Sequence, residues 1–237
     1  MQEEYVKWYS PILGKETEML IFGHSGVPVI IFPTSMGTYH QNKDFYLIES
    51  VSWFLDNGLI KIYCPDSVDE HSFYNEMIHP SDRIKNHTYY DSFILNEIVS
   101  RACNETGHDK VVMAGCSFGG YQAINFALRH PDRVRDVFSM GGAFDIKNHL
   151  DGFYDENVYY NNPVDFLGSL SDENIWKMGI VLGVGEEDFC LPQNKRLAEI
   201  MQRKNIPHWL DVRPNAVHDW PVWREMLPSY FGRMKFN

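Results

Sequence analysis

A chain of 237 residues is long enough to bury one sizeable α/β core without help from disulfides or metals. Its 21 Lys and Arg residues stand against 32 Asp and Glu residues, and this formal net charge of −11 argues against nucleic acid or an anionic membrane surface as a partner. The sequence shows neither a signal peptide nor a continuous apolar run that could span a membrane, and its four cysteines lack paired spacing, so we expect a cytoplasmic protein with reduced thiols.

The N-terminal third of the chain is predicted to alternate strands with a helix. Residues 4–9 and 16–23 have the pattern of an antiparallel hairpin. Residues 27–32 form a continuous apolar run, which is typical of a strand buried on both faces. A helix is expected over residues 43–57, and the next buried strand over residues 59–64.

The middle of the chain continues this alternation. A polar loop over residues 65–72 is followed by a helix predicted for residues 89–104. Residues 111–115 are predicted to form a short buried strand, and a helix with one buried face follows it, because Tyr121, Ile124 and Leu128 recur at helical spacing.

The C-terminal part contributes the remaining elements. The predicted strands cover residues 134–140, 179–184 and 209–213. A final helix is expected over residues 222–234, interrupted or entered anew near Pro228.

Strands that alternate with helices predict an α/β fold with a mostly parallel sheet and helices on both faces. The whole chain, residues 1–237, is expected to form one domain without a large lid. Residues 144–178 hold no core strand and are rich in Tyr, Phe, Asn and Asp, so we expect a small insertion packed over one end of the sheet, the end at which any active site is expected.

The segment from Gly115 to Gly119 (Gly-Cys-Ser-Phe-Gly) matches the pattern G-x-S-x-G. A strand precedes it and a helix follows it, which is the context of a nucleophile elbow: a tight turn that holds the hydroxyl of Ser117 clear of the backbone. The alternative is a glycine-rich turn in which this serine only caps the helix.

Ligands of an open parallel sheet bind at the carboxyl ends of its strands, so the residues that follow each strand are the candidates for chemistry. Asp188 follows the strand at 179–184 and His218 follows the last strand, which gives the order Ser, Asp, His found in α/β hydrolases. His208 enters the last strand and is expected at the opposite edge. Besides Asp188, the candidate acids are Glu186, Glu187 and Asp145.

An acyl-transfer reaction also needs backbone N–H groups that stabilise an oxyanion. One donor is expected at Phe118, directly after the nucleophile, and the other in the loop after the strand at 27–32. Pro33 has no N–H, so the second donor is Ser35 or Met36, and the sequence does not distinguish them. The sequence has no H-E-x-x-H motif, no dinucleotide-binding fingerprint and no Walker loop, so we expect neither a metal nor a cofactor.

At this point the chain resembles the α/β-hydrolase esterase family that includes esterase D (S-formylglutathione hydrolase), the enterochelin esterases and the mycolyltransferases. The resemblance extends over nearly the whole chain and depends on short segments that lie near predicted strand ends or in the insertion: 29–37, 63–66, 115–121, 161–166 and 218–220. It implies a triad of Ser117, Asp188 and His218 that hydrolyses carboxylic esters without a cofactor.

The function expected from the sequence is therefore hydrolysis of small, short-acyl esters through an acyl-enzyme, with a small-molecule ester as the partner. The same triad could instead serve acyl transfer to an alcohol, or amide or peptide hydrolysis. A third hypothesis is a noncatalytic hydrolase fold used for binding.

Overall fold

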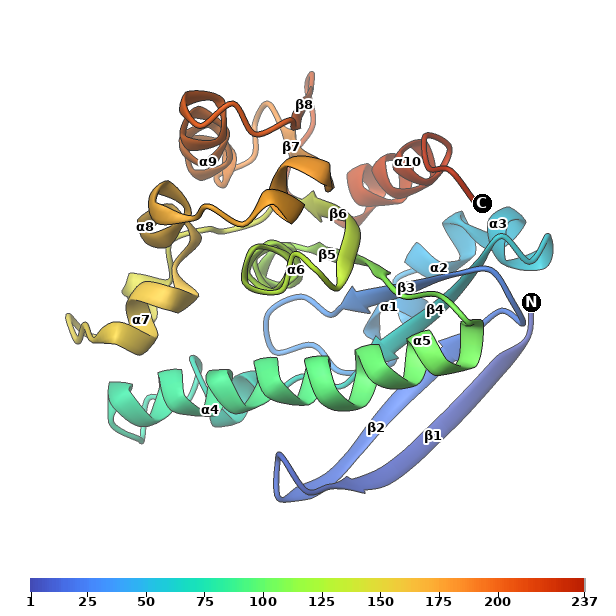
Figure 1. Cartoon of the computed structure of the whole chain (residues 1–237), viewed down its shortest axis with the longest axis horizontal. Coiled ribbons are helices and arrows are strands. Elements are labelled where there is room, and N and C mark those ends of the chain that lie inside the picture. The colour runs from blue at the N-terminus through green and yellow to red at the C-terminus, as the bar shows by residue number, and fades with distance from the viewer. Residues whose placement is uncertain (237) are drawn as a thin grey trace.

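The central sheet is formed by segments whose side chains are apolar on one or both faces. The computed structural model, which describes residues 1–236, has eight strands in the order β1-β2-β4-β3-β5-β6-β7-β8 (Figure 1). The strands are β1 (Glu3–Ser10), β2 (Lys15–Phe22), β3 (Val27–Phe32), β4 (Ile60–Pro65), β5 (Val111–Cys116), β6 (Val134–Met140), β7 (Gly179–Gly185) and β8 (Trp209–Arg213). Strand β2 is antiparallel to β1 and β4, and the other neighbours are parallel, so the predicted α/β fold is confirmed.

Helices cover both faces of this sheet. The α-helices are α1 (Gln41–Asp44), α2 (Leu47–Ser50), α3 (Ser52–Asp56), α4 (Pro80–Phe93), α5 (Ser100–Thr106), α6 (Phe118–Arg129), α7 (Glu156–Asn161), α8 (Pro163–Phe166), α9 (Leu191–Arg203) and α10 (Trp220–Phe231). Side chains of α4, α6 and α9 belong to one buried cluster, and those of α2, α3 and α10 belong to another on the opposite face. No helix within residues 1–236 is both long enough and apolar enough to cross a membrane.

Strand β5 shows how the two clusters position the candidate nucleophile. Val111 and Met113 pack into the cluster on one face, whereas Val112 and Ala114 pack into the cluster on the other, as the two-residue period of a strand requires. All residues of β5 are buried, and neighbouring strands flank it on both sides. The turn that follows β5 therefore starts from a rigid central strand.

The helix predicted over residues 43–57 is wrong as a single element. The segment forms the short helices α1, α2 and α3 instead. Tyr46 separates the first two with a left-handed backbone (φ 61°), which interrupts the regular turn. Leu47, Val51 and Leu55 are fully buried in this arrangement, so packing against the sheet outweighs helical regularity. No glycine or proline marks the break in the sequence.

Two other helices differ from their predicted limits. The helix expected at residues 89–104 begins earlier, at Pro80, where the ring of His79 accepts a hydrogen bond from the amide of Ser81 at 3.2 Å. It continues through the π-helix η2 (Ile94–Val99) into α5. The last helix runs through Pro228 without the expected interruption.

The region between β6 and β7 is an irregular series of short helical segments: η3 (Ile146–His149), α7, α8, η4 (Leu167–Ser169) and η5 (Glu173–Lys177). Many of its apolar side chains, such as Phe144 and Phe166, join the same buried cluster as α4 and α6. Pro163 is the first residue of α8, a position where its missing N–H is not needed.

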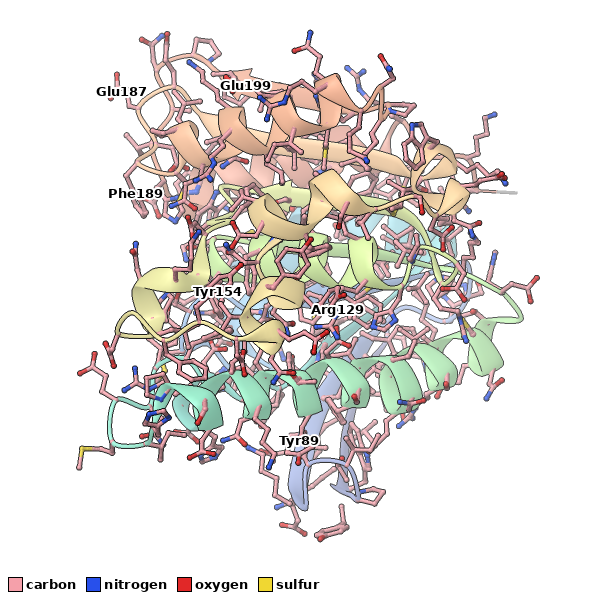
Figure 2. The ribbon with its side chains drawn as sticks, turned by 60° about the vertical axis from the view of Figure 1, so that its left-hand side comes forward. Tyr89, Arg129, Tyr154, Glu187, Phe189 and Glu199 are labelled. Carbon is pink, nitrogen blue, oxygen red and sulfur yellow. The ribbon has the colours of Figure 1, made fainter. Side chains whose placement is uncertain are left out.

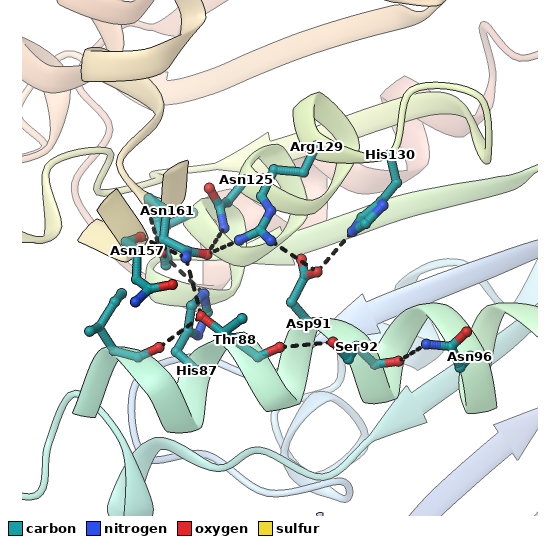
Figure 3. A network of polar contacts seen from close by, with 12 residues as sticks. His87, Thr88, Asp91, Ser92, Asn96, Asn125, Arg129, His130, Asn157 and Asn161 are labelled. Carbon is teal, nitrogen blue, oxygen red and sulfur yellow. Dashed lines mark hydrogen bonds and ion pairs between the residues drawn. The ribbon is translucent and has the colours of Figure 1, made fainter. Parts of the chain in front are cut away.

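A buried polar network links α4, α6 and α7 (Figure 3). Asp91 on α4 lies 2.8 Å from Nε2 of His130 and 3.5 Å from Nη2 of Arg129. Asn161 on α7 accepts hydrogen bonds through Oδ1 from Arg129 and, at 3.1 Å, from Asn125 on α6. Burial alone would raise the pKa of Asp91, but the hydrogen bond from His130 and the charge of Arg129 outweigh it and lower the pKa. The network therefore fixes the helix that follows the elbow.

Replacing Asp91 with Ala should lower the free energy of unfolding by about 3 kcal/mol at pH 7, because the guanidinium of Arg129 and the ring of His130 lose a buried carboxylate partner. The pKa of Asp91 is lower in the folded chain, so its contribution is present above the ordinary pKa of an aspartate and is lost as the pH falls through the folded-state value. Urea unfolding of both proteins at pH 7 and in acid measures the difference. A difference that stays constant in acid would contradict this assignment.

Candidate active site

Ser117 lies in a strained turn between β5 and α6. Its backbone has φ 55° and ψ −122°, a conformation that few residues other than glycine adopt. The amide of Ser117 donates to the carbonyl of Met140 at 2.8 Å, and its carbonyl accepts from the amide of Gly120 at 2.9 Å. The surrounding backbone therefore holds this residue in a strained geometry, as the G-x-S-x-G pattern predicts for a nucleophile elbow.

The side chains of Ser117, His218 and Asp188 form a continuous hydrogen-bonded chain. Oγ of Ser117 lies 2.9 Å from Nε2 of His218. Nδ1 of the same ring lies 2.9 and 2.8 Å from the two carboxylate oxygens of Asp188. Because a carboxylate only accepts, Nδ1 carries the ring proton and Nε2 is left to accept from the serine hydroxyl. The carboxylate also accepts from the amide of Cys190 at 2.7 Å, which fixes its orientation.

The other candidate acids lie in different contacts. Asp145 pairs with the ammonium of Lys147 and the guanidinium of Arg196, each at 3.5 Å. Glu186 and Glu187 are exposed, and the former accepts from a backbone amide. His208 is hydrogen-bonded at 2.8 Å to the carbonyl of Ile206, before β8 and so away from the carboxyl ends of the strands. Among the candidate residues, the structure brings only Ser117, His218 and Asp188 together.

The loop after β3 packs directly on the elbow. A Cβ atom on Gly119 would lie 2.8 Å from the carbonyl oxygen of Phe32 and even closer to that of Pro33. A Cβ on Gly115 would collide with the backbone of Gly119 itself. Glycine at these positions therefore allows the backbone of the loop and the backbone of the elbow to approach each other.

The amides of this loop distinguish the two candidate donors. Thr34 donates its amide to Oε1 of Gln41 at 2.8 Å, and Gly37 donates to the carbonyl of Thr34 at 2.9 Å. The amide of Met36 donates to Oδ2 of Asp69 at 2.9 Å. Within residues 34–37 only the amide of Ser35 has no hydrogen-bond acceptor. The alternative of Met36 as the second oxyanion donor is therefore disfavoured, since its N–H group is already engaged.

Phe118 has the position expected of the other donor. It is the first residue of α6, where a backbone N–H has no acceptor within the helix. Its side chain is buried against four rings, with centroid distances of 5.0 Å to Tyr121, 5.5 Å to Tyr74, and 5.7 Å to both Phe73 and His149. Burial lowers the pKa of His149, and the charge of Arg83 lowers it further, so this imidazole is neutral at pH 7.

An exposed aromatic ring lies beside His218. The ring of Phe189 lies 4.2 Å from the ring of His218, centroid to centroid, and is 74% exposed. Figure 2 shows Phe189 and Glu187 together at one edge of the molecule, in the loop after β7. Behind the histidine, the ring of Trp223 meets it edge to face at 5.0 Å. One face of the imidazole is thus covered by an exposed aromatic ring.

One group of side chains has the composition of a metal site. Donor atoms of Asp188, Cys190 and His218 lie within 4.8 Å of one another. Burial and the neighbouring carboxylate raise the pKa of Cys190 to about 12, so its thiol is protonated, whereas a metal binds the thiolate. The remaining two side chains are hydrogen-bonded to each other, so a metal would have to break that contact.

Sequence reasoning missed the residues that support the oxyanion loop. Asp69 lies in the 3₁₀ turn η1 (Asp69–His71) after β4, and Gln41 lies at the start of α1. Residues that follow a parallel strand are candidates for a site, and Asp69 follows β4. This position is the sequence signal that could have identified its carboxylate. Nothing in the sequence indicated the role of the glutamine.

The chain has the α/β-hydrolase fold. Residues 79–174 match a family model described as alpha/beta hydrolase fold. A ferulic acid esterase superposes with a TM-score of 0.78 at 16% identity, covering 97% of this chain and 95% of the other. Comparison with curated protein sequences gives no significant match.

Two further solved structures share this fold. FphF, a fluorophosphonate-binding serine hydrolase of Staphylococcus aureus, gives a TM-score of 0.77 at 17% identity, covering 98% of this chain and 97% of the other. An S-formylglutathione hydrolase from Agrobacterium tumefaciens gives 0.77 at 13% identity, covering 97% and 93%.

Replacing Gly119 with Ala should lower the free energy of unfolding by about 1 to 3 kcal/mol, because the added methyl group meets backbone atoms that cannot move aside. Gly168 is a suitable control, since a Cβ there has nothing within 4 Å. Urea unfolding of Gly119→Ala and Gly168→Ala measures both effects. Equal stabilities would show that the loop after β3 does not press on the elbow.

Proposed function

We propose that this α/β-hydrolase chain is a serine carboxylesterase that cleaves small, short-acyl esters through an acyl-enzyme. The observation that carries the proposal is the hydrogen-bonded chain from Oγ of Ser117 through the ring of His218 to Asp188. A serine hydroxyl is a weak nucleophile unless a base removes its proton, and a base is most effective when a third group orients it. The chain supplies these groups at one edge of its sheet.

In the first step, Nε2 of His218 accepts the hydroxyl proton while Oγ of Ser117 attacks the carbonyl carbon of the ester. The carbonyl π bond opens and places its electron pair on oxygen. Asp188 stabilises the resulting imidazolium, because its carboxylate faces Nδ1. In this proposal the amides of Phe118 and Ser35 donate to the oxyanion, since both are left without acceptors.

The tetrahedral intermediate then collapses. The carbonyl re-forms, the bond to the alcohol oxygen breaks, and the imidazolium of His218 gives its proton to the departing alkoxide. Water repeats the sequence on the acyl-enzyme: His218 takes a proton from water, the hydroxide attacks the acyl carbon, and the proton returns to Oγ of Ser117 as the acid leaves. Each proton that His218 takes it also returns, so the cycle needs no cofactor.

The surroundings of the triad favour a short acyl group and an open leaving-group side. The alcohol must depart close to His218, which donates its proton, and this side carries the exposed ring of Phe189. On the side of Phe118, the rings of Tyr74 and His149 pack against it and against each other, with 4.9 Å between their centroids. In this proposal, the close packing of these rings excludes a long acyl chain from that side.

The comparisons and the cysteines agree with the proposal. One of the similar structures is named as a ferulic acid esterase and another as an S-formylglutathione hydrolase. The third is named as a fluorophosphonate-binding serine hydrolase. The four cysteines are free, which is the state that the cytoplasm maintains, so we propose a cytoplasmic location and a small-molecule ester as the partner.

Replacing Ser117 with Ala should abolish covalent labelling by a fluorophosphonate and lower kcat by about 10⁵-fold, because the nucleophile is lost. The wild type should release nitrophenol from nitrophenyl acetate in a burst equal to the enzyme concentration. Ser100→Ala is the matched control, since Ser100 lies on α5 and its hydroxyl donates a hydrogen bond to the carbonyl of Leu95, not to a residue of the triad. Failure of the native wild-type protein to label would refute the proposal.

Replacing Phe189 with Ala should raise KM for nitrophenyl acetate about three- to tenfold, because an aryl leaving group loses a ring to stack on. KM for ethyl acetate should change by less than about twofold, and kcat should stay similar for both esters. Initial rates over a range of ester concentrations give these values. An equal effect on both substrates would mean that Phe189 does not contact the leaving group.

A further inference from the structure

The carboxylate of Asp69 contacts both elements that supply the proposed oxyanion donors. We infer that Asp69 is a positioning residue that fixes the oxyanion hole by holding the loop after β3 and the elbow helix α6 at once. This inference rests on the proposed function, because the hole has a role only if an oxyanion forms. Asp69 touches neither the triad nor the reacting atoms.

The first contact of Asp69 is with a strained turn. Met36 has a left-handed backbone (φ 56°), which carries an energetic cost for a residue other than glycine. Its amide donates to Oδ2 of Asp69 at 2.9 Å, a charge-assisted hydrogen bond that offsets this cost. On the other side of Ser35, the amide of Thr34 is held at 2.8 Å by Gln41. The free amide of Ser35 thus lies between two anchored neighbours.

The second contact of Asp69 is with α6. Its Oδ1 accepts from Nε2 of Gln122 at 3.2 Å. Gln122 lies four residues after Phe118, so it is on the same face of the helix and one turn further on. One carboxylate therefore links the loop that presents the amide of Ser35 with the helix that begins at the amide of Phe118. The distance between the two donors depends on this link.

A charged side chain at this position is otherwise unfavourable. Asp69 is 1% exposed, and no Lys, Arg or His within residues 1–236 forms an ion pair with it. The titratable groups that face it are another acid, Asp66, and three phenols: those of Tyr74, Tyr90 and Tyr121. Burial raises the pKa of Asp69 to about 7, although the amide of residue 36 and the amide group of residue 122 partly oppose this shift.

The raised pKa of Asp69 means that its ionised form lowers the free energy of unfolding. The pKa of Asp69 is higher in the folded chain than in the unfolded chain, so the folded chain binds more protons between about pH 4 and pH 7. The free energy of unfolding therefore falls as the pH rises through this window. A group that lowers stability near neutral pH while holding a loop at the site has the signature of a functional residue.

Asparagine and leucine have side chains branched at Cγ like that of aspartate, with the same number of heavy atoms, and they test the contact directly. Asp69→Asn keeps an oxygen that accepts from the amide of Met36. Its new NH₂ group can donate to Oε1 of Gln122 once the side-chain amide of Gln122 rotates by half a turn, and this oxygen is buried without a partner in the wild type. Asp69→Leu offers no acceptor. We expect Asp69→Leu to lower kcat about 10- to 100-fold with KM within about twofold, and Asp69→Asn to stay within about threefold of wild type at pH 8.

A boronic acid that forms a tetrahedral adduct with Ser117 provides a readout that a merely structural role would not change. Its inhibition constant should rise in Asp69→Leu by about the same factor as kcat falls, because both depend on the oxyanion hole. Asp136→Leu is the control, since Asp136 is a partly buried acid of raised pKa on β6, paired at 3.0 Å with Arg135. Its kcat and its inhibition constant should match those of wild type.

The outcomes separate this inference from the proposed function. If the wild type neither labels nor turns over an ester, the proposed function fails. If the wild type is active and both Asp69 variants stay within threefold of it, the positioning role fails. Equal losses of kcat in both variants, with a lower unfolding midpoint, would show a structural role only.

A second measurement does not depend on the folding of the leucine variant. In ¹⁵N-labelled wild type, the amide proton of Met36 should shift with pH as Asp69 titrates near pH 7. In Asp69→Asn this titration should be absent. Identical pH dependence in the two proteins would overturn the contact on which the inference rests.

Discussion

The strained backbone of Ser117 is the constraint on which the rest of the site depends. A residue with φ near 55° is held there only when its surroundings allow no alternative, and here they are close-packed backbone. Gly115 and Gly119 meet each other and the end of β3, so the turn has no room to relax. The hydroxyl is consequently presented in a fixed direction, and every partner has to be brought to it.

The partners arrive from loops that are distant in sequence but follow neighbouring strands. Asp188 follows β7 and His218 follows β8, and parallel pairing with β6 and β5 brings these strand ends to the same edge as the elbow. Backbone contacts then refine the placement, as when the amide of Cys190 fixes the acid. The sheet positions the side chains to within a few ångströms, and local hydrogen bonds determine their orientation.

Much of this arrangement could be predicted from the sequence, because strands such as β3, β5 and β7 are short runs of apolar and small residues with little ambiguity. The structure brings Ser117, Asp188 and His218 into contact at the ends of β5, β7 and β8, and their catalytic roles belong to the proposed function. The break at Tyr46 could not be predicted, because tertiary packing rather than local composition causes it. The position of Asp69 after β4 could have marked its carboxylate as a candidate, but its hydrogen bond to the Met36 amide joins distant segments, and no pattern of residues predicts that partner.

The network around Asp91 and Asn161 also bears on the order in which the chain folds. Its contacts join residues that are 36, 39 and 73 positions apart, and such closures form later than local helices because each must overcome the entropy of a long loop. Helix α6 can form from its own local hydrogen bonds. Its contacts with Asn161 form only when the insertion, residues 144–178, docks on it. We therefore expect the docking of the insertion to complete the fixing of α6, the helix that begins directly after the serine.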